Sequence, residues 1–184
     1  RSYTYTKLAN SLKGTGQTIS KATVIRYMQW LEWSFFSAHV EVFSANVKKR
    51  IQTVKKSYLI DNYFSSHFSS TLSANLGYMM EQAVFHTLHI RSTWDPRYDL
   101  SYWKDYSGNE VDFVVLHKKT VKELIQVTFA SSIAEVPQRE TRALIKAAKA
   151  LGQSSGQLIT WDVEETVTVE GIEVLYTPLL KWLS

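Results

Sequence analysis

Two acidic residues stand two positions apart in the stretch "EVDFVV" and could serve as ligands of a metal ion. The stretch alternates in the way typical of a β-strand, so Glu110 and Asp112 point to the same face. In "KELIQVTFA" the same alternation places Gln126 and Thr128 together. If these two strands pair, Asp112 and Gln126 can be neighbours.

A divalent metal that activates water for phosphodiester hydrolysis needs several oxygen ligands and a nearby cation that stabilises the developing charge. Asp112, Gln126, a backbone carbonyl and Glu81 from an upstream segment could supply the oxygens. The pattern therefore predicts a site for Mg²⁺ or Mn²⁺. The part that is missing is a positively charged side chain beside the metal. Two alternatives stay open: solvated acids on an edge strand for Glu110 and Asp112, and a buried amide bound to backbone for Gln126.

Hydrophobic periodicity predicts the elements that must position these residues. Apolar residues recur in "ANLGYMMEQAVFHTLHI", which indicates an amphipathic helix of about four turns that carries Glu81 beside its apolar face. A second helix is expected in "PQRETRALIKAAKALG", between Pro137 and Gly152. Strands are expected at 98–105, 110–117, 121–130, 156–162 and 166–177, and a last helical turn at 178–184. The turns "YSGN" and "HKKT" favour a meander of the first three strands, and the whole order predicts an α/β sandwich with a mixed sheet.

The first third of the chain has a different order of elements. Two short helices are expected in "TYTKLANSLKG" and "KATVIRYMQWLEW", the second capped by Ser20. Trp30 and Trp33, beside Tyr27, are expected to close this small domain. The strand-like stretches "SAHVEVFS" and "TVKKSYLID" then flank the basic link "ANVKKRIQ". This order predicts a winged helix-turn-helix domain over residues 1–62, followed by a second domain over residues 63–184.

The positive charge is concentrated in this first third. Residues 1–62 contain 10 Lys and Arg against 3 acidic residues, a net +7, whereas residues 63–184 contain 11 against 14, a net −3. The second helix and the expected wing would present side chains to DNA. The residues predicted to contact it are Lys21, Thr23, Arg26, Lys48, Lys49 and Arg50. A solvated basic face is the alternative, and winged helices also dock proteins.

Composition excludes some classes of function. The 184 residues include no cysteine, which excludes disulfides and thiolate chemistry and fits the reducing cytoplasm. No run approaches about 18 apolar residues, so no membrane partner is expected. Arg1 in place of an initiator Met suggests a fragment of a longer protein.

The stretches "GYMMEQAVFHTL", "SYWKDYSGNEVDFVV" and "ELIQVTFA" resemble the PD-(D/E)XK nuclease-like fold. The version resembled is the C-terminal domain of archaeal AAA-type ATPases, a group of largely unknown function. The upstream stretches "ISKATVIRYMQWLE" and "KKSYLIDN" resemble the segment that precedes this domain in those ATPases, so the resemblance covers nearly the whole chain. It implies an α/β (α+β) chain in which a winged helix precedes a restriction-endonuclease-like mixed sheet flanked by helices.

The resemblance also implies roles for single residues. Glu81, Asp112 and Gln126 would form the acidic catalytic and metal-binding site, and Thr128 stands where active nucleases carry lysine. A threonine cannot replace a cation beside the scissile phosphate, so hydrolysis requires a cation from elsewhere. The candidates are Lys104, which the active-enzyme hypothesis prefers, Arg139 and Arg142.

Three functions follow as expectations. The favoured one is a C-terminal ATPase fragment that binds DNA through its winged helix and carries an incomplete nuclease-like site. The alternatives are an active Mg²⁺-dependent DNA nuclease, with Lys104 as the relocated lysine, and a module that docks proteins or regulates the ATPase without binding nucleic acid. The expected partners are DNA and an N-terminal ATPase domain outside this chain, and homo-oligomer formation stays open. No G-x-x-x-x-G-K-[ST] motif occurs, so ATP would bind only in that other domain.

Overall fold

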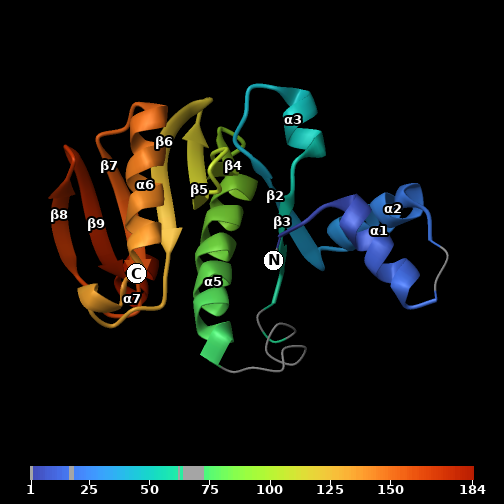
Figure 1. The fold of residues 1–184 in the computed structure, drawn as a ribbon, viewed down its shortest axis with the longest axis horizontal. Coiled ribbons are helices and arrows are strands. Elements are labelled where there is room, and N and C mark those ends of the chain that lie inside the picture. The colour runs from blue at the N-terminus through green and yellow to red at the C-terminus, as the bar shows by residue number, and fades with distance from the viewer. Residues whose placement is uncertain (1, 17–18, 62, 64–72) are drawn as a thin grey trace.

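The computed structural model describes residues 2–16, 19–61, 63 and 73–184. A mixed sheet of nine strands, in the order β1-β3-β2-β4-β5-β6-β7-β9-β8, runs through this part of the chain (Figure 1). The α/β fold class expected from the sequence is confirmed. The boundary expected after residue 62 adjoins residues outside the described ranges, so the division into two domains stays a prediction.

In the described residues of the N-terminal third, the elements are β1 (Ser2–Tyr3), α1 (Tyr5–Gly14), α2 (Lys21–Trp33), β2 (Ser37–Val42), α3 (Val47–Gln52) and β3 (Lys55–Leu59). The remainder consists of α5 (Ser73–Trp94), β4 (Tyr98–Lys104), β5 (Glu110–His117), β6 (Thr120–Val127), the 3₁₀ turn η1 (Ile133–Glu135), α6 (Gln138–Leu151), β7 (Ser155–Thr160), β8 (Glu165–Val169), β9 (Ile172–Pro178) and α7 (Leu179–Leu183). Among the described residues, no helix is both long and apolar enough to cross a bilayer.

The centre of the sheet is the expected meander. Strands β4, β5 and β6 pair antiparallel in sequence order, and β6 then pairs in parallel with β7. Helix α6, which lies between β6 and β7, makes this parallel crossover possible. It ends at Gly152, whose positive φ of 66° closes the helix as the sequence predicted.

The two long helices pack on opposite faces of this sheet. Val114 and Leu116 of β5 share a core with α6, whereas Phe113 and Val115 share a core with α5. Successive side chains of a strand point to opposite faces, so β5 is buried on both sides. Its acidic residues therefore lie in the middle of the molecule, away from any sheet edge.

The N-terminal strands continue the same sheet. β2 pairs antiparallel with β3 and in parallel with β4, through Glu41 opposite Ser101 and Val42 opposite Tyr102. Helices α1 and α2 lie beyond this end of the sheet (Figure 1). The pairing brings β3 close enough to α5 and β5 for its side chains to join the acidic residues.

Two local expectations for the N-terminal third are wrong. The basic link between β2 and β3 is the helix α3, because Asn46 Oδ1 accepts the Lys49 N–H at 3.2 Å and caps a first turn. Trp30 and Trp33, expected to close the small domain, are 51% and 72% exposed. Since α2 packs mainly on α1 and β2, it buries only a narrow stripe that contains Val24.

Candidate functional site

The acidic site forms where β5 and β6 separate. The antiparallel ladder between them extends to the pair Phe113 and Ile125, after which β6 follows β7. Beyond this point side chains replace the ladder: Gln126 Oε1 accepts the Asp112 N–H at 3.0 Å, and Asp112 Oδ2 accepts the Val127 N–H at 2.9 Å. The predicted neighbourhood of Asp112 and Gln126 is thus present, and the Gln126 amide bonds to backbone.

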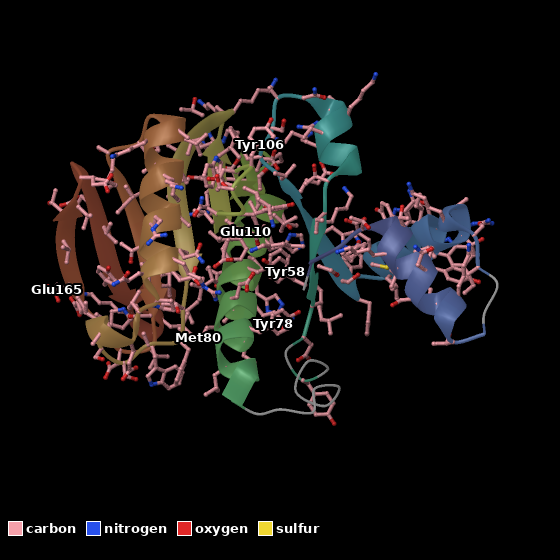
Figure 2. The ribbon with its side chains drawn as sticks, in the orientation of Figure 1. Tyr58, Tyr78, Met80, Tyr106, Glu110 and Glu165 are labelled. Atoms are coloured by element: carbon pink, nitrogen blue, oxygen red, sulfur yellow. The ribbon has the colours of Figure 1, made fainter. Side chains whose placement is uncertain are left out.

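A lysine that the sequence analysis did not select lies at the centre of the site. Lys56 Nζ of β3 is 2.6 Å from Asp112 Oδ1, 3.0 Å from Glu110 Oε1 and 3.4 Å from Glu81 Oε1. Tyr58, on the same strand, donates its hydroxyl to Glu81 Oε1 at 2.6 Å. We call Lys56, Glu81, Glu110 and Asp112 the acidic cluster; it joins β3, α5 and β5. Figure 2 shows Tyr58 and Glu110 near the middle of the molecule.

Burial and charge oppose each other in this cluster. Burial lowers the pKa of the Lys56 ammonium. The carboxylates of Asp112, Glu81 and Glu110 raise this pKa by more than burial lowers it, so the net shift is upward. Burial also raises the pKa of the Asp112 carboxyl to about 7, assisted by Glu81 and opposed by Lys56. Lys56 therefore stays charged at neutral pH, and the pKa of Asp112 lies above its ordinary value.

The cations that the sequence analysis did select lie at the rim or elsewhere. Lys104 Nζ donates to Glu110 Oε2 at 2.8 Å from a 39% exposed side chain. Arg139, 83% exposed, pairs with Glu140 at 3.0 Å. Arg142 is exposed and lines a different pocket on α6. Thr128 is half-buried, and its backbone N–H donates to the carbonyl of Ile159 on β7.

A pocket of about 280 Å³ opens beside the acidic cluster. Its polar lining includes Glu110, Asp112 and Gln126, with Arg139 and Glu140 from the first turn of α6. Glu140 accepts the Gln126 Nε2–H, so the amide is held at both ends. The pocket is small and polar, which suits an ion or a single polar group of a larger molecule.

As the residues stand, they do not fit a divalent metal. Asp112 Oδ1 faces Lys56 and its Oδ2 faces a backbone N–H, while Glu110 bonds Lys56 through one oxygen and Lys104 through the other. The predicted ligand Gln126 binds backbone through its oxygen. Within the described ranges, no group of three or more His, Cys, Asp or Glu side chains is arranged to hold a metal. The carboxylates surround an ammonium instead, and the predicted use of Mg²⁺ or Mn²⁺ stays a prediction.

The residues predicted to contact nucleic acid fall into three groups. Lys21, Arg26 and Lys48 are exposed on α2 and α3. Thr23 belongs to the helix cap, where its hydroxyl lies 2.9 Å from the hydroxyl of Ser20. Arg50 approaches Glu41 at 3.7 Å, and Lys49 Nζ lies 5.1 Å from the ring centre of Tyr106.

Sequence reasoning missed Lys56, Tyr58 and Glu140. The stretch "TVKKSYLID" carried a signal for the first two, since alternation places them on one face of a strand with a lysine among apolar residues. Only the pairing of β2 with β4 brings that face to Asp112, and a strand partner so distant in sequence has no local signal.

The fold and site define a mixed α/β domain with a buried lysine-centred acidic cluster. Residues 76–180, more than half of the chain, match the family model described as "Domain of unknown function (DUF4143)", and the chain belongs to this family. DUF4143 is often found at the C-terminus of AAA-type ATPases. An uncharacterized protein of Haemophilus influenzae is 26% identical over 177 residues, which are 96% of this chain and 40% of that protein. The chain thus spans about two fifths of this relative's length, and no solved structure matches it.

Proposed function

We propose that this chain is the nucleic-acid-binding C-terminal part of a longer ATPase, with a nuclease-like domain that holds DNA and does not cut it. The family and the greater length of the Haemophilus influenzae protein support the assignment to a longer ATPase. The observation that carries the binding of DNA is the contact between Lys49 and Tyr106. This contact joins the basic helix α3 to the turn between β4 and β5, whose residues Gly108 and Asn109 line the pocket beside the acidic cluster.

Tyr106 has the properties of a platform for a nucleic-acid base. It lies in the turn between β4 and β5, and its side chain is 99% exposed. Figure 2 places it at the end of the molecule where α3 lies, beyond Glu110. Bases of a single strand stack on exposed aromatic rings, and a lysine beside the ring can contact the adjoining phosphate.

Further cations lie along the same rim. Lys48 is exposed next to Lys49 on α3, Lys104 precedes the Tyr106 turn, and Arg139 lines the pocket. These side chains can bind phosphates, and the buried Lys56 offsets one of the three carboxylate charges of the acidic cluster. A strand crossing from α3 to the pocket would therefore meet positive groups.

The absence of cutting follows from how the carboxylates are used. Hydrolysis of a phosphodiester needs water activated by a metal held on free oxygens. In the acidic cluster these oxygens bond Lys56, Lys104 and the backbone of Val127. The domain can hold a strand with this arrangement, but it offers no activated water.

The test is a titration of labelled single-stranded and duplex DNA at two salt concentrations, with Mg²⁺ or with EDTA. We expect affinity that falls as salt rises, and intact DNA in both buffers. Replacing Lys48 and Lys49 by Gln should lower the slope of log affinity against log salt by about 2 for duplex, since each phosphate contact contributes about 0.9. Tyr106→Ala should weaken single-strand binding by about 1 to 3 kcal/mol, the typical value of one stacked base.

A matched control removes two positive charges at the opposite end of β5. Lys118 and Lys119 form the turn between β5 and β6 and have φ values of 50° and 67°. Asn tolerates such φ values, so Lys118→Asn with Lys119→Asn should fold normally and leave the salt slope nearly unchanged. Equal loss in both double variants would mean that only net charge matters. Metal-dependent cleavage abolished by Asp112→Ala would overturn the non-cutting half and establish the nuclease.

A second candidate function, protein docking, is favoured by α2. Its exposed face is aromatic as well as basic: Tyr27, Trp30 and Trp33 are 47%, 51% and 72% exposed, and Phe35 follows at 78%. Trp and Tyr dominate the binding energy of protein interfaces, and such contiguous apolar surface is uncommon on a free domain. The absence of salt-sensitive binding to any DNA in the titration would leave docking within the ATPase as the function.

A further inference from the structure

We propose that the Lys56 ammonium takes the place of a divalent cation in the acidic cluster, so that a lysine and not a metal holds β3, α5 and β5 together. This inference concerns the ion in the cluster and is independent of whether the chain binds nucleic acid. It makes the site complete without a cofactor and assigns its cation to the N-terminal third of the chain.

Three carboxylate oxygens surround the Lys56 ammonium. An ammonium group has three N–H bonds, and three carboxylate oxygens lie 2.6, 3.0 and 3.4 Å from Nζ, one each from Asp112, Glu110 and Glu81. The oxygens come from a helix and a strand that are separate in sequence, and the lysine comes from a third element. A cation at this point therefore connects three parts of the fold.

Burial makes the cation obligatory. The Lys56 side chain is 7% exposed and that of Asp112 is 11% exposed. Carboxylates so close together and withdrawn from water repel one another unless a positive group lies between them. The usual positive group in such an oxygen cluster is Mg²⁺ or Ca²⁺, which requires about six oxygen ligands at 2.0 to 2.6 Å. Within the described part of the chain, Nζ has only three oxygen contacts, at 2.6, 3.0 and 3.4 Å, which is fewer than such a metal requires and matches the three N–H donors of an ammonium.

Two of the three carboxylate oxygens that do not face Lys56 are also engaged, and the Glu81 oxygen that faces Lys56 has a second donor. Asp112 Oδ2 accepts the Val127 N–H, Glu110 Oε2 accepts from Lys104, and Glu81 Oε1 accepts from Tyr58 as well as from Lys56. A metal could enter only if Lys56 left. It follows that removing the lysine side chain should convert the cluster into a site for a divalent cation.

The experiment measures Mn²⁺ binding, by electron paramagnetic resonance and calorimetry, to the chain and to Lys56→Ala. We expect no Mn²⁺ at the cluster of the unaltered chain and one bound ion in the variant. At about 100 times its dissociation constant, Mn²⁺ should raise the Tm of the variant by about 5 to 10 °C and leave that of the unaltered chain unchanged. The double variant Lys56→Ala with Asp112→Asn should lose this gain.

Lys104→Ala is the matched control, because it removes the other lysine bound to Glu110 and leaves Lys56 in place. It should gain no Mn²⁺ site. The proposal is overturned if the unaltered chain binds one Mn²⁺ and Asp112→Asn abolishes that binding, since the cluster would then be a metal site. It is also overturned if folded Lys56→Ala binds no Mn²⁺. Where Lys56→Ala is unfolded in EDTA, the expected result is folding on addition of Mn²⁺, and a variant unfolded in both conditions counts against the proposal.

Discussion

Lys56 and Lys104 bind the two oxygens of the same carboxylate, Glu110, from opposite environments. Lys56 Nζ is 3.0 Å from Glu110 Oε1 with a side chain 7% exposed, and it also bonds Asp112 and Glu81. Lys104 Nζ is 2.8 Å from Glu110 Oε2, but its side chain is 39% exposed and Glu110 is its one ion-pair partner among the described residues. The two distances are nearly equal, so distance alone cannot rank the two lysines.

The difference lies in what each carboxylate would meet if its lysine were removed. Water and salt would replace Lys104 at the rim, whereas at Lys56 they would have to replace a cation bound to the buried Asp112 and to the partly buried Glu81 and Glu110. The interior pair therefore decides whether the fold holds, and the rim pair is available for a ligand. The predictions below test this contrast.

The largest effect is expected for Lys56→Ala in buffer without divalent metal. Three carboxylates lose their cation, and breaking a buried ion pair by removing one partner costs about 3 to 5 kcal/mol. The loss of stability is measured as the difference in the free energy of unfolding between the variant and the unaltered chain, from urea titration in EDTA. A loss below about 1 kcal/mol would place Lys56 in the same class as Lys104 and break the contrast.

The pH dependence of stability should identify Asp112 as the titrating member of the cluster. Burial raises the pKa of Asp112 to about 7, above the ordinary value near 4, so the folded chain binds the extra proton between these values. The contribution of Asp112 to stability therefore falls as pH rises from about 4 to 7, by at most about 1.4 kcal/mol per pH unit, and is constant above.

The check compares the unfolding free energy of the chain with that of Asp112→Asn across this range. Asn cannot titrate, so the stability of the unaltered chain relative to the variant should decline from pH 4 to 7. A difference that stays constant over these pH values would show that Lys56 keeps the pKa of Asp112 at or below its ordinary value.

Much of the acidic site could be predicted from local pattern. Strand alternation predicted Asp112 and Gln126 as neighbours, and helical periodicity placed Glu81 beside an apolar face that packs over the same strands. These predictions held because the three segments pair or pack with near neighbours in the sequence. The α/β class and the ends of α6 followed from the same kind of signal.

The remainder depended on contacts that have no local signal. The missing cation was sought on β4 and α6, whereas it comes from β3, which reaches the site only because β2 joins β4. The aromatic residues of α2 were expected in a core, since aromatic side chains are usually buried, but α2 lacks the neighbours that would cover them. In both cases the tertiary partner, and not the segment's own composition, decided the outcome.

The smallest effect is expected for Lys104→Ala, and it sharpens the contrast most. Lys104 is half-exposed and Glu110 keeps its bond to Lys56, so the loss in unfolding free energy should stay below about 1 kcal/mol. Because exposed pairs are screened by salt, the loss should shrink further at about 1 M salt, where the screening length is about 3 Å. Urea titrations at low and high salt measure both values. A loss above about 2 kcal/mol that persists in high salt would mean that Lys104 belongs to the buried network, and the rim would then have no lysine to spare for a phosphate.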